Sequence, residues 1–138
     1  MQVSPVEEHM SGRCGDTPLD PLRRMRVYIS GQYTQGDPAE NTRLAIEAGN
    51  RVLDAGMVPF VPHLSHFWHM VTPRSYEDWM AIDICFLSSC DCVWSLPRVA
   101  GDGSSPGADR EETKARELGI PVFRDFEAIL RYRETQSL

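Results

Sequence analysis

Ser105 to Glu111 form the stretch of this chain whose residue types and spacing best fit a chemical site. Pro106 and Gly107 allow a tight turn into a helix, and the first amides of a helix, together with its dipole, can bind an anion. Ser105 can add a hydroxyl group, and Glu111 follows about one helical turn later, near the same mouth. The stretch therefore predicts an anion seat beside a carboxylate.

Three other side chains could take part, and each also has a plain structural interpretation. Tyr28, in the apolar run Met25–Ile29, is either a core tyrosine or a phenol near Glu111. Asp83 falls on an otherwise apolar helix face, where an acid is either a hydrogen-bond acceptor for a strand or a site residue, because buried acids are rare without a partner. Glu112 points about 100° away from its neighbour Glu111, and either acid could simply favour the helix dipole.

The histidines and cysteines do not form a metal-binding pattern. His63, His66 and His69 stand three residues apart, but no matching carboxylate motif accompanies them, so we expect them to line a loop or a pocket. His63 lies closest to a strand end and is the one that we expect to contact a ligand. Cys90-Asp91-Cys92 is not a CxxC pair, which favours buried thiols. We expect no metal and no other cofactor.

Length and composition fit an ordinary globular domain. The chain has 138 residues, of which 41% are hydrophobic and 25% charged, with a net charge of −6. No apolar run approaches the roughly 20 residues of a membrane helix, and no signal-peptide pattern opens the chain, so we expect a cytoplasmic protein without a membrane partner. The acidic balance argues against nucleic acid as a partner, although local amides can still bind a small anion.

The elements that must position these residues alternate along the chain. Apolar runs between turn residues predict four short strands, at Met25–Ile29, Met57–Val61, Cys92–Leu96 and Pro121–Phe123. Capping residues and helical spacing predict helices that start near Asp37, Ser75, Ala108 and Phe126 and end near Ala55, Leu87, Leu118 and Tyr132. The segment Pro62–Pro73 is predicted as a loop or a short helix.

This alternation predicts an α/β fold. We expect a small doubly wound parallel sheet, flavodoxin-like or Rossmann-like, with strand order 2-1-3-4 and helices on both faces. Ligands bind such sheets beyond the carboxyl ends of the strands, where the winding reverses, which here lies between the first and third strands. We expect one domain over residues 25–132, after a disordered or loosely docked extension, 1–24, and before a polar tail, 133–138. The turn after Ile29 lacks the GxGxxG pattern, so a dinucleotide is not expected.

Together these motifs resemble those of the nucleoside 2-deoxyribosyltransferase superfamily. The resemblance rests on Tyr28-Ile29-Ser30-Gly31, on Asp83 followed eight positions later by Asp91, and on Ser105-x-Gly107-x-x-x-Glu111. It spans about residues 25–124. The pattern is most similar to that of the 2′-deoxynucleoside 5′-phosphate N-hydrolases, and it also resembles the DUF4406 branch of the superfamily.

The resemblance implies an enzyme and assigns roles to its residues. Glu111 would attack the anomeric carbon of a (deoxy)nucleoside or nucleoside 5′-monophosphate and form a glycosyl-enzyme ester, by hydrolysis or base transfer. Tyr28 would position or tune that carboxylate, and Asp83 would hold or protonate the departing base. The predicted substrate-binding residues are Gly31, Gln32, His63, Ser105, Gly107 and Ala108. The resemblance also implies a homodimer or a higher homo-oligomer.

The chain departs from the hydrolase pattern in three places. The turn Gly31–Thr34 lacks the arginine that follows the glycine in the hydrolases. The serine that the hydrolases lend to a neighbouring subunit has no clear counterpart, and Arg124 is the candidate to replace it. The loop Pro97–Ser104 is longer. These differences concern the phosphate and the substrate more than the nucleophile.

Two other functions fit the same pattern. A non-catalytic nucleotide-binding or sensing module would keep the anion seat and could lose Glu111 or Asp83, yet this chain has both. A different enzyme acting on a phosphate-bearing ligand is the third hypothesis, because a fold alone does not decide a function.

Overall fold

The computed structural model describes residues 20–136, and its centre is a four-stranded, all-parallel sheet with the order β2-β1-β3-β4. The strands are β1 (Arg26–Ser30), β2 (Val58–Phe60), β3 (Cys92–Ser95) and β4 (Val122–Phe123). The α/β fold and the strand order predicted from the sequence are therefore confirmed, although each strand is displaced or trimmed by one or two residues.

The two faces of β1 serve different purposes because side chains alternate along a strand. Val27 and Ile29 pack into the main hydrophobic cluster, between the sheet and the helices on that side. Tyr28 points to the opposite face, where it belongs to a smaller apolar cluster. Ser30, two residues further on, is also fully buried and lies on the face of Tyr28. The central strand thus supplies core on one side and polar groups on the other.

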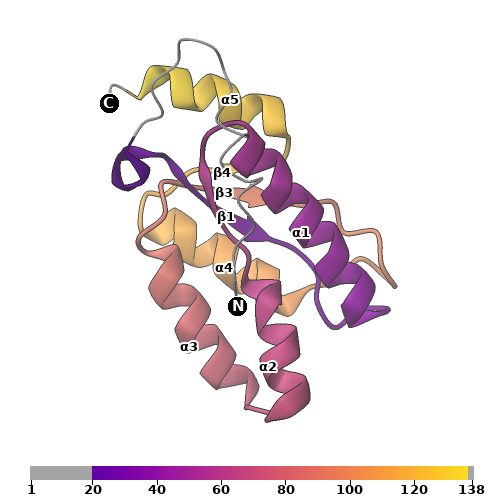
Figure 1. Cartoon of the computed structure of the whole chain (residues 1–138). Helices are drawn as coiled ribbons and strands as arrows, with labels where there is room; N and C mark the ends of the chain where they lie inside the picture. Colours follow the sequence, from indigo (N-terminus) through magenta and orange to yellow (C-terminus); the bar gives the residue numbers. More distant parts are fainter. Residues whose placement is uncertain (1–19, 137–138) are drawn as a thin grey trace, which may run out of the picture.

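Helices cover both faces of the sheet, as predicted (Figure 1). One face carries the first and last helices, α1 (Pro38–Asp54) and α5 (Phe126–Thr135). The other face carries α3 (Tyr76–Leu87) and α4 (Pro106–Glu117). Their start signals act as expected, since Asp37 and Ser75 each accept a hydrogen bond from a backbone N–H of the first turn.

The histidine-rich segment Pro62–Pro73 forms more structure than a loop. A single 3-10 turn, η3 (Pro62–Leu64), leads directly into the short helix α2 (Ser65–Val71). In Figure 1, α2 and α3 extend side by side beyond the end of the sheet. The sequence left the loop and the short helix open, and the structure decides for the helix.

Several predicted boundaries were wrong. Helix α4 begins at Pro106, two residues before the predicted start, because Ser105 is its N-cap. The closing helix continues to Thr135, into the segment predicted as a tail. The predicted N-terminal extension lies mostly outside the described residues, which open with the 3-10 turn η2 (Pro21–Arg23).

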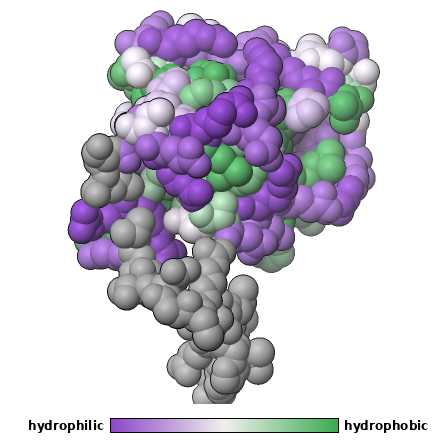
Figure 2. Space-filling view, turned by 90° about the horizontal axis from the view of Figure 1, so that it is seen from above, coloured by the Kyte–Doolittle hydropathy of each residue, from purple (hydrophilic) through white to green (hydrophobic). Residues whose placement is uncertain are grey.

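The surface is mostly polar on the face shown in Figure 2, where hydrophobic areas are small and separate. Helix α2 contrasts with this pattern, because several of its large apolar side chains are more than half exposed: Phe67, Trp68, Met70 and Val71. Within residues 20–136, no helix combines the length and the apolar character needed to cross a bilayer.

Candidate active site

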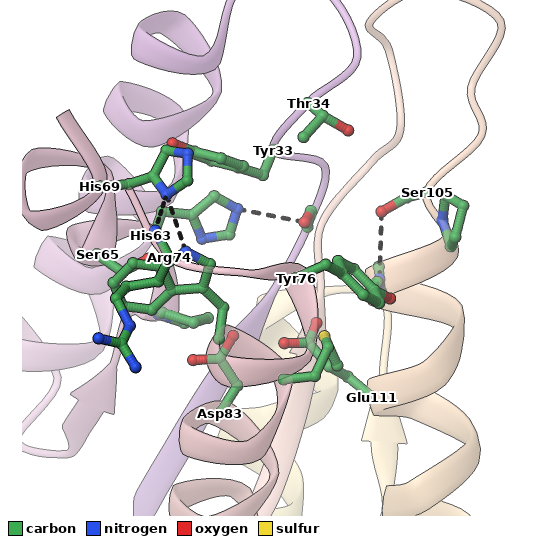
Figure 3. A pocket seen from close by; sticks show the side chains of 17 residues that line it. Tyr33, Thr34, His63, Ser65, His69, Arg74, Tyr76, Asp83, Ser105 and Glu111 are labelled. Carbon is green, nitrogen blue, oxygen red and sulfur yellow. Dashed lines mark hydrogen bonds between the residues drawn. The ribbon is translucent and has the colours of Figure 1, made fainter. Parts of the chain in front are cut away.

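A cavity of about 330 Å³ lies beyond the carboxyl ends of the strands, where the fold predicts a ligand site. Its walls come from the segment after β1, from η3 and α2, from α3, and from the start of α4. Figure 3 shows Glu111 and Asp83 at one end of the cavity, with His63 and His69 on one side and Ser105 on the other. Most of the predicted site residues are thus brought together.

Glu111 is held by two side chains of β1. The Tyr28 hydroxyl donates a hydrogen bond to Oε2 of Glu111, and the Ser30 hydroxyl donates to Oε1 at 3.1 Å. These contacts are possible because Tyr28 and Ser30 share the sheet face on which α4 packs. Glu111 is only 5% exposed and lines the cavity. A carboxylate gripped at both oxygens has a fixed orientation.

Burial dominates the electrostatics of this end of the cavity. It raises the pKa of Glu111 to about 8, with a smaller contribution from the charge of Asp83, whereas the bonds from Tyr28 and Ser30 oppose the rise. Burial likewise raises the pKa of Asp83, half-buried on α3, to about 7. The pKa of Tyr28 lies well above its usual value, chiefly through burial and then through the charge of Glu111. Two carboxyl groups that gain and lose protons near neutral pH therefore share one cavity.

The anion seat is smaller than the sequence predicts. The Ser105 hydroxyl accepts a bond from the N–H of Ala108 at 3.2 Å, and the N–H of Asp109 is bonded to the Ser105 carbonyl. Pro106 has no N–H to offer. Within residues 20–136, the backbone N–H of Gly107 is therefore the one amide of the first turn that has no protein partner. The Ser105 hydroxyl beside it can still donate its own proton.

Gly31 and His63 meet at the opposite wall. The Nε2–H of His63 donates to the carbonyl oxygens of Gln32, at 3.0 Å, and of Gly31, at 3.2 Å. This fixes the proton on Nε2 and joins η3 to the turn after β1. The other ring nitrogen, Nδ1, is buried without a partner. Burial lowers the pKa of His63, which keeps the ring neutral, and Nδ1 is closed off from the cavity as the wall stands.

Gln32 has a different place from the predicted one. Its side chain does not line this cavity but bonds to the loop before α4: Nε2 donates to the carbonyls of Ala100 and Ser104, and Oε1 accepts from the N–H of Ala100. All polar groups of the amide are used in this way. We therefore correct the predicted substrate contact of Gln32 to a structural role, in which it ties the two loops that overhang the cavity.

Glu112 has partners that the sequence did not suggest. It is 3% exposed, accepts a bond from Ser95 at 2.9 Å and pairs with Arg98 at 2.7 Å. Arg124 and Arg116 approach its other oxygen at 3.4 and 3.5 Å. Glu112 thus anchors α4 to the end of β3 and to the loop that follows. The i,i+4 spacing to Arg116 is the one local signal for these contacts, because Ser95, Arg98 and Arg124 lie outside the helix.

The wall formed by α2 and α3 is aromatic. Tyr33 bonds through its hydroxyl to Nδ1 of His66 at 2.6 Å, and Trp79 donates its indole N–H to Nδ1 of His69 at 3.0 Å. Tyr33, His69 and Trp79 line the cavity. The bond from Trp79 to a residue ten positions earlier left no recognisable pattern in the sequence.

A buried carboxylate with fixed oxygens, a second carboxyl group and an aromatic wall suit a nucleophilic reaction on a small planar ligand. Within the described part of the chain, no group of three or more His, Cys, Asp or Glu side chains is arranged to hold a metal ion.

Residues 25–125 match the family described as "Domain of unknown function (DUF7768)". The chain belongs to this family. Its fold is similar to that of a solved 2-deoxyribosyltransferase from the psychrotolerant bacterium Bacillus psychrosaccharolyticus, with a TM-score of 0.53 and 18% sequence identity over 70% of this chain and 69% of that one. At this identity the likeness establishes the fold alone. No curated protein matches the sequence. The DUF4406-like branch stays a prediction.

Proposed function

We propose that this DUF7768 protein cleaves or transfers the N-glycosidic bond of a (deoxy)nucleoside or nucleoside 5′-monophosphate. The observation that carries the proposal is the grip of Tyr28 and Ser30 on both oxygens of Glu111, inside a cavity that also contains Asp83. The fold shared with a 2-deoxyribosyltransferase supports it. A purely structural glutamate would have no reason to face a cavity next to a second carboxyl group with a raised pKa.

The reaction needs two steps and no cofactor. The two carboxyl groups are coupled, and the reacting form is the one with Glu111 ionised and the proton on Asp83. In the first step, a Glu111 oxygen forms a bond to the anomeric carbon while the bond from that carbon to the base nitrogen breaks, and Asp83 gives its proton to the leaving base. In the second, water or another base attacks the anomeric carbon, the ester bond to Glu111 breaks, and the attacking group returns a proton to Asp83. Tyr28 and Ser30 keep the Glu111 oxygens in line for both steps.

The substrate spans the cavity from wall to wall. Its sugar lies over Glu111, its 5′ end lies toward Ser105 and Gly107, and its base lies toward the aromatic wall of Tyr33 and Trp79. Aromatic side chains suit a base because every base offers a flat face for stacking. The 5′ end meets one free amide and one hydroxyl, which can hold either a hydroxyl group or a phosphate.

We also propose that the protein forms a homo-oligomer through α2. Exposed apolar side chains in a row on a seven-residue helix cost free energy in water, and a second copy of the chain would cover them. Light scattering should show a dimer or larger assembly for the native chain and a smaller species for Phe67→Glu combined with Met70→Glu. A native chain that is monomeric at micromolar concentration would overturn this part.

The function itself is tested by incubating the purified protein with deoxynucleosides and their 5′-monophosphates and measuring free base by mass spectrometry. A second base in excess distinguishes transfer from hydrolysis, since transfer yields a new nucleoside. Denaturing the enzyme rapidly during turnover should trap a sugar on a peptide that contains Glu111. If no substrate in the panel releases base, the proposal fails.

A further inference from the structure

His69 is locked in place by two N–H groups. The indole Nε1–H of Trp79 donates to Nδ1 of His69 at 3.0 Å, and the backbone N–H of Arg74 donates to the same nitrogen at 3.2 Å. The rings of His69 and Trp79 also pack edge to face, with centroids 5.9 Å apart and an angle of 67°. The orientation of the imidazole is therefore fixed by groups from the loop before α3 and from α3 itself.

The two bonds also fix where the proton of the ring sits. A nitrogen that accepts hydrogen bonds carries no proton, so the neutral ring of His69 is protonated on Nε2. A proton on Nδ1 would instead face the N–H groups of Trp79 and Arg74 and break both bonds. His69 consequently presents an N–H donor on the side of the ring turned away from Trp79.

This donor is open. Within residues 20–136, no protein group bonds to Nε2 of His69. Nε2 of His69 is not one of the fully buried atoms without a partner, since within the same residues the only such side-chain atom is Nδ1 of His63. His69 is a lining residue of the cavity, together with both of its partners. Its Nε2–H is thus an oriented donor, on a residue of the cavity wall, that no group within the described residues accepts.

The position of His69 indicates which part of a ligand it meets. In Figure 3, His69 lies on the opposite side of the cavity from Ser105, with Glu111 between the two walls. A nucleoside placed with its anomeric carbon at Glu111 and its 5′ end toward Ser105 directs its base to the wall of His69. Trp79 and Tyr33 make that wall aromatic.

We propose that His69 is a specificity-determining residue, whose Nε2–H donates a hydrogen bond to an acceptor atom on the base, a carbonyl oxygen or an unprotonated ring nitrogen. The inference rests on the proposed function, because it needs a base in the cavity. His69 would select a base by the acceptor atom that the base presents toward α2. Trp79 would stack on the base and hold the His69 ring in place, without selecting one base over another.

The tautomer can be tested without a ligand. Long-range nitrogen–proton correlation spectra of the native chain, assigned with His69→Asn, should show an unprotonated Nδ1 and a protonated Nε2 for His69 at pH 7.5. A Trp79→Phe variant, which loses one donor to Nδ1, should weaken this preference. A predominant Nδ1–H form in the native chain would overturn the inference.

Ligand selection is tested in a Glu111→Gln background, which prevents turnover. His69→Asn keeps a side-chain acceptor near the position of Nδ1 but removes the Nε2 donor, whereas His69→Gln can place an amide N–H near the position of Nε2. The probes are matched pairs: 2′-deoxyinosine with its analogue that lacks the exocyclic oxygen, 2′-deoxyuridine with its analogue that lacks the 4-oxygen, and purine nucleosides with their 7-deaza analogues. Calorimetry gives the dissociation constants.

One acceptor atom should stand out. Its removal should weaken binding about fivefold to tenfold when His69 is present, have no effect in His69→Asn, and have an intermediate effect in His69→Gln. If nucleosides bind but no acceptor behaves in this way, the role of His69 falls and the proposed function stands. If no nucleoside binds and the native enzyme releases no base, both fall.

Discussion

Glu111 and Glu112 are neighbours in the chain, yet they bond to different strands. Glu111 receives hydrogen bonds from Tyr28 and Ser30 of β1 at the cavity, whereas Glu112 is bound by Ser95 of β3 and paired with Arg98, away from it. Helix α4 packs on the sheet against both β1 and β3. Successive residues of a helix point about 100° apart, so the two carboxylates are directed to separate places. Two buried acids in sequence thus have separate tasks.

This separation predicts opposite effects of the same change. Glu111→Gln should lower kcat by a factor of about a thousand or more, because an amide cannot act as the nucleophile. Glu112→Gln should retain activity but lose about 1–3 kcal/mol of stability, since the pairing with Arg98 is weakened. Base release and thermal unfolding of both variants check this. A folded but inactive Glu112→Gln, with an active Glu111→Gln, would reverse the assignment.

Asp83 should matter most when the leaving base is poor. Asp83→Asn cannot donate a proton as a carboxylic acid does, so we expect a loss of about a hundredfold or more with natural nucleosides. A nitrophenyl deoxyriboside, whose leaving group departs without a proton, should lose far less. Steady-state rates on both substrates are the measurement. Equal losses would make Asp83 a structural residue.

Stability should fall toward alkaline pH because of Glu111. The pKa of Glu111 is raised from its usual value to about 8 in the folded protein. Above about pH 5 the native state therefore still holds a proton that the unfolded chain has already released. Stability therefore declines as the pH rises from about 5 to about 8. Glu111→Gln removes this effect, so its melting temperature should exceed that of the native chain by several degrees at pH 8.5, at about 2–4 °C for each kcal/mol, and by little at pH 5. A constant difference across this range would contradict the prediction.

Ser105 can distinguish a phosphate from a hydroxyl at the 5′ end. Ser105→Asp keeps an N-cap acceptor for Ala108 but places a negative charge at the seat. Binding of a 5′-monophosphate should weaken by more than about tenfold, whereas binding of the nucleoside should change little. Calorimetry on the Glu111→Gln background measures both. Ser105→Ala is the control for the hydroxyl alone, with about 1 kcal/mol of stability lost with the cap. Monophosphate binding that is unchanged in Ser105→Asp would show that the phosphate does not sit there.

Much of this arrangement can be predicted from the sequence because it depends on local signals. Turn and capping residues mark the elements, and the handedness of crossovers then sets the strand order and brings Tyr28 near Glu111. The roles of Glu112, Gln32 and His69 could not be predicted in this way. Each depends on partners that only folding brings close: Ser95 and Arg98, the loop at Ala100 and Ser104, and Trp79. Hydrogen bonds between distant side chains leave no periodicity in a single sequence.

The cavity takes its nucleophile support from β1 and part of its opposite wall from α2, and this affects which substitutions the protein can accept in evolution. The groups that hold Glu111 belong to β1, which is paired on both sides and buried, so substitutions there disturb the whole sheet. The wall that faces the proposed base belongs partly to α2, a short helix at the margin of the fold with no buried residues of its own. Substitutions at Ser65 and His69, the residues of α2 that line the cavity, can accumulate at little cost to the sheet. One chemical step could thus be passed on unchanged while descendants of this chain acquire different ligands.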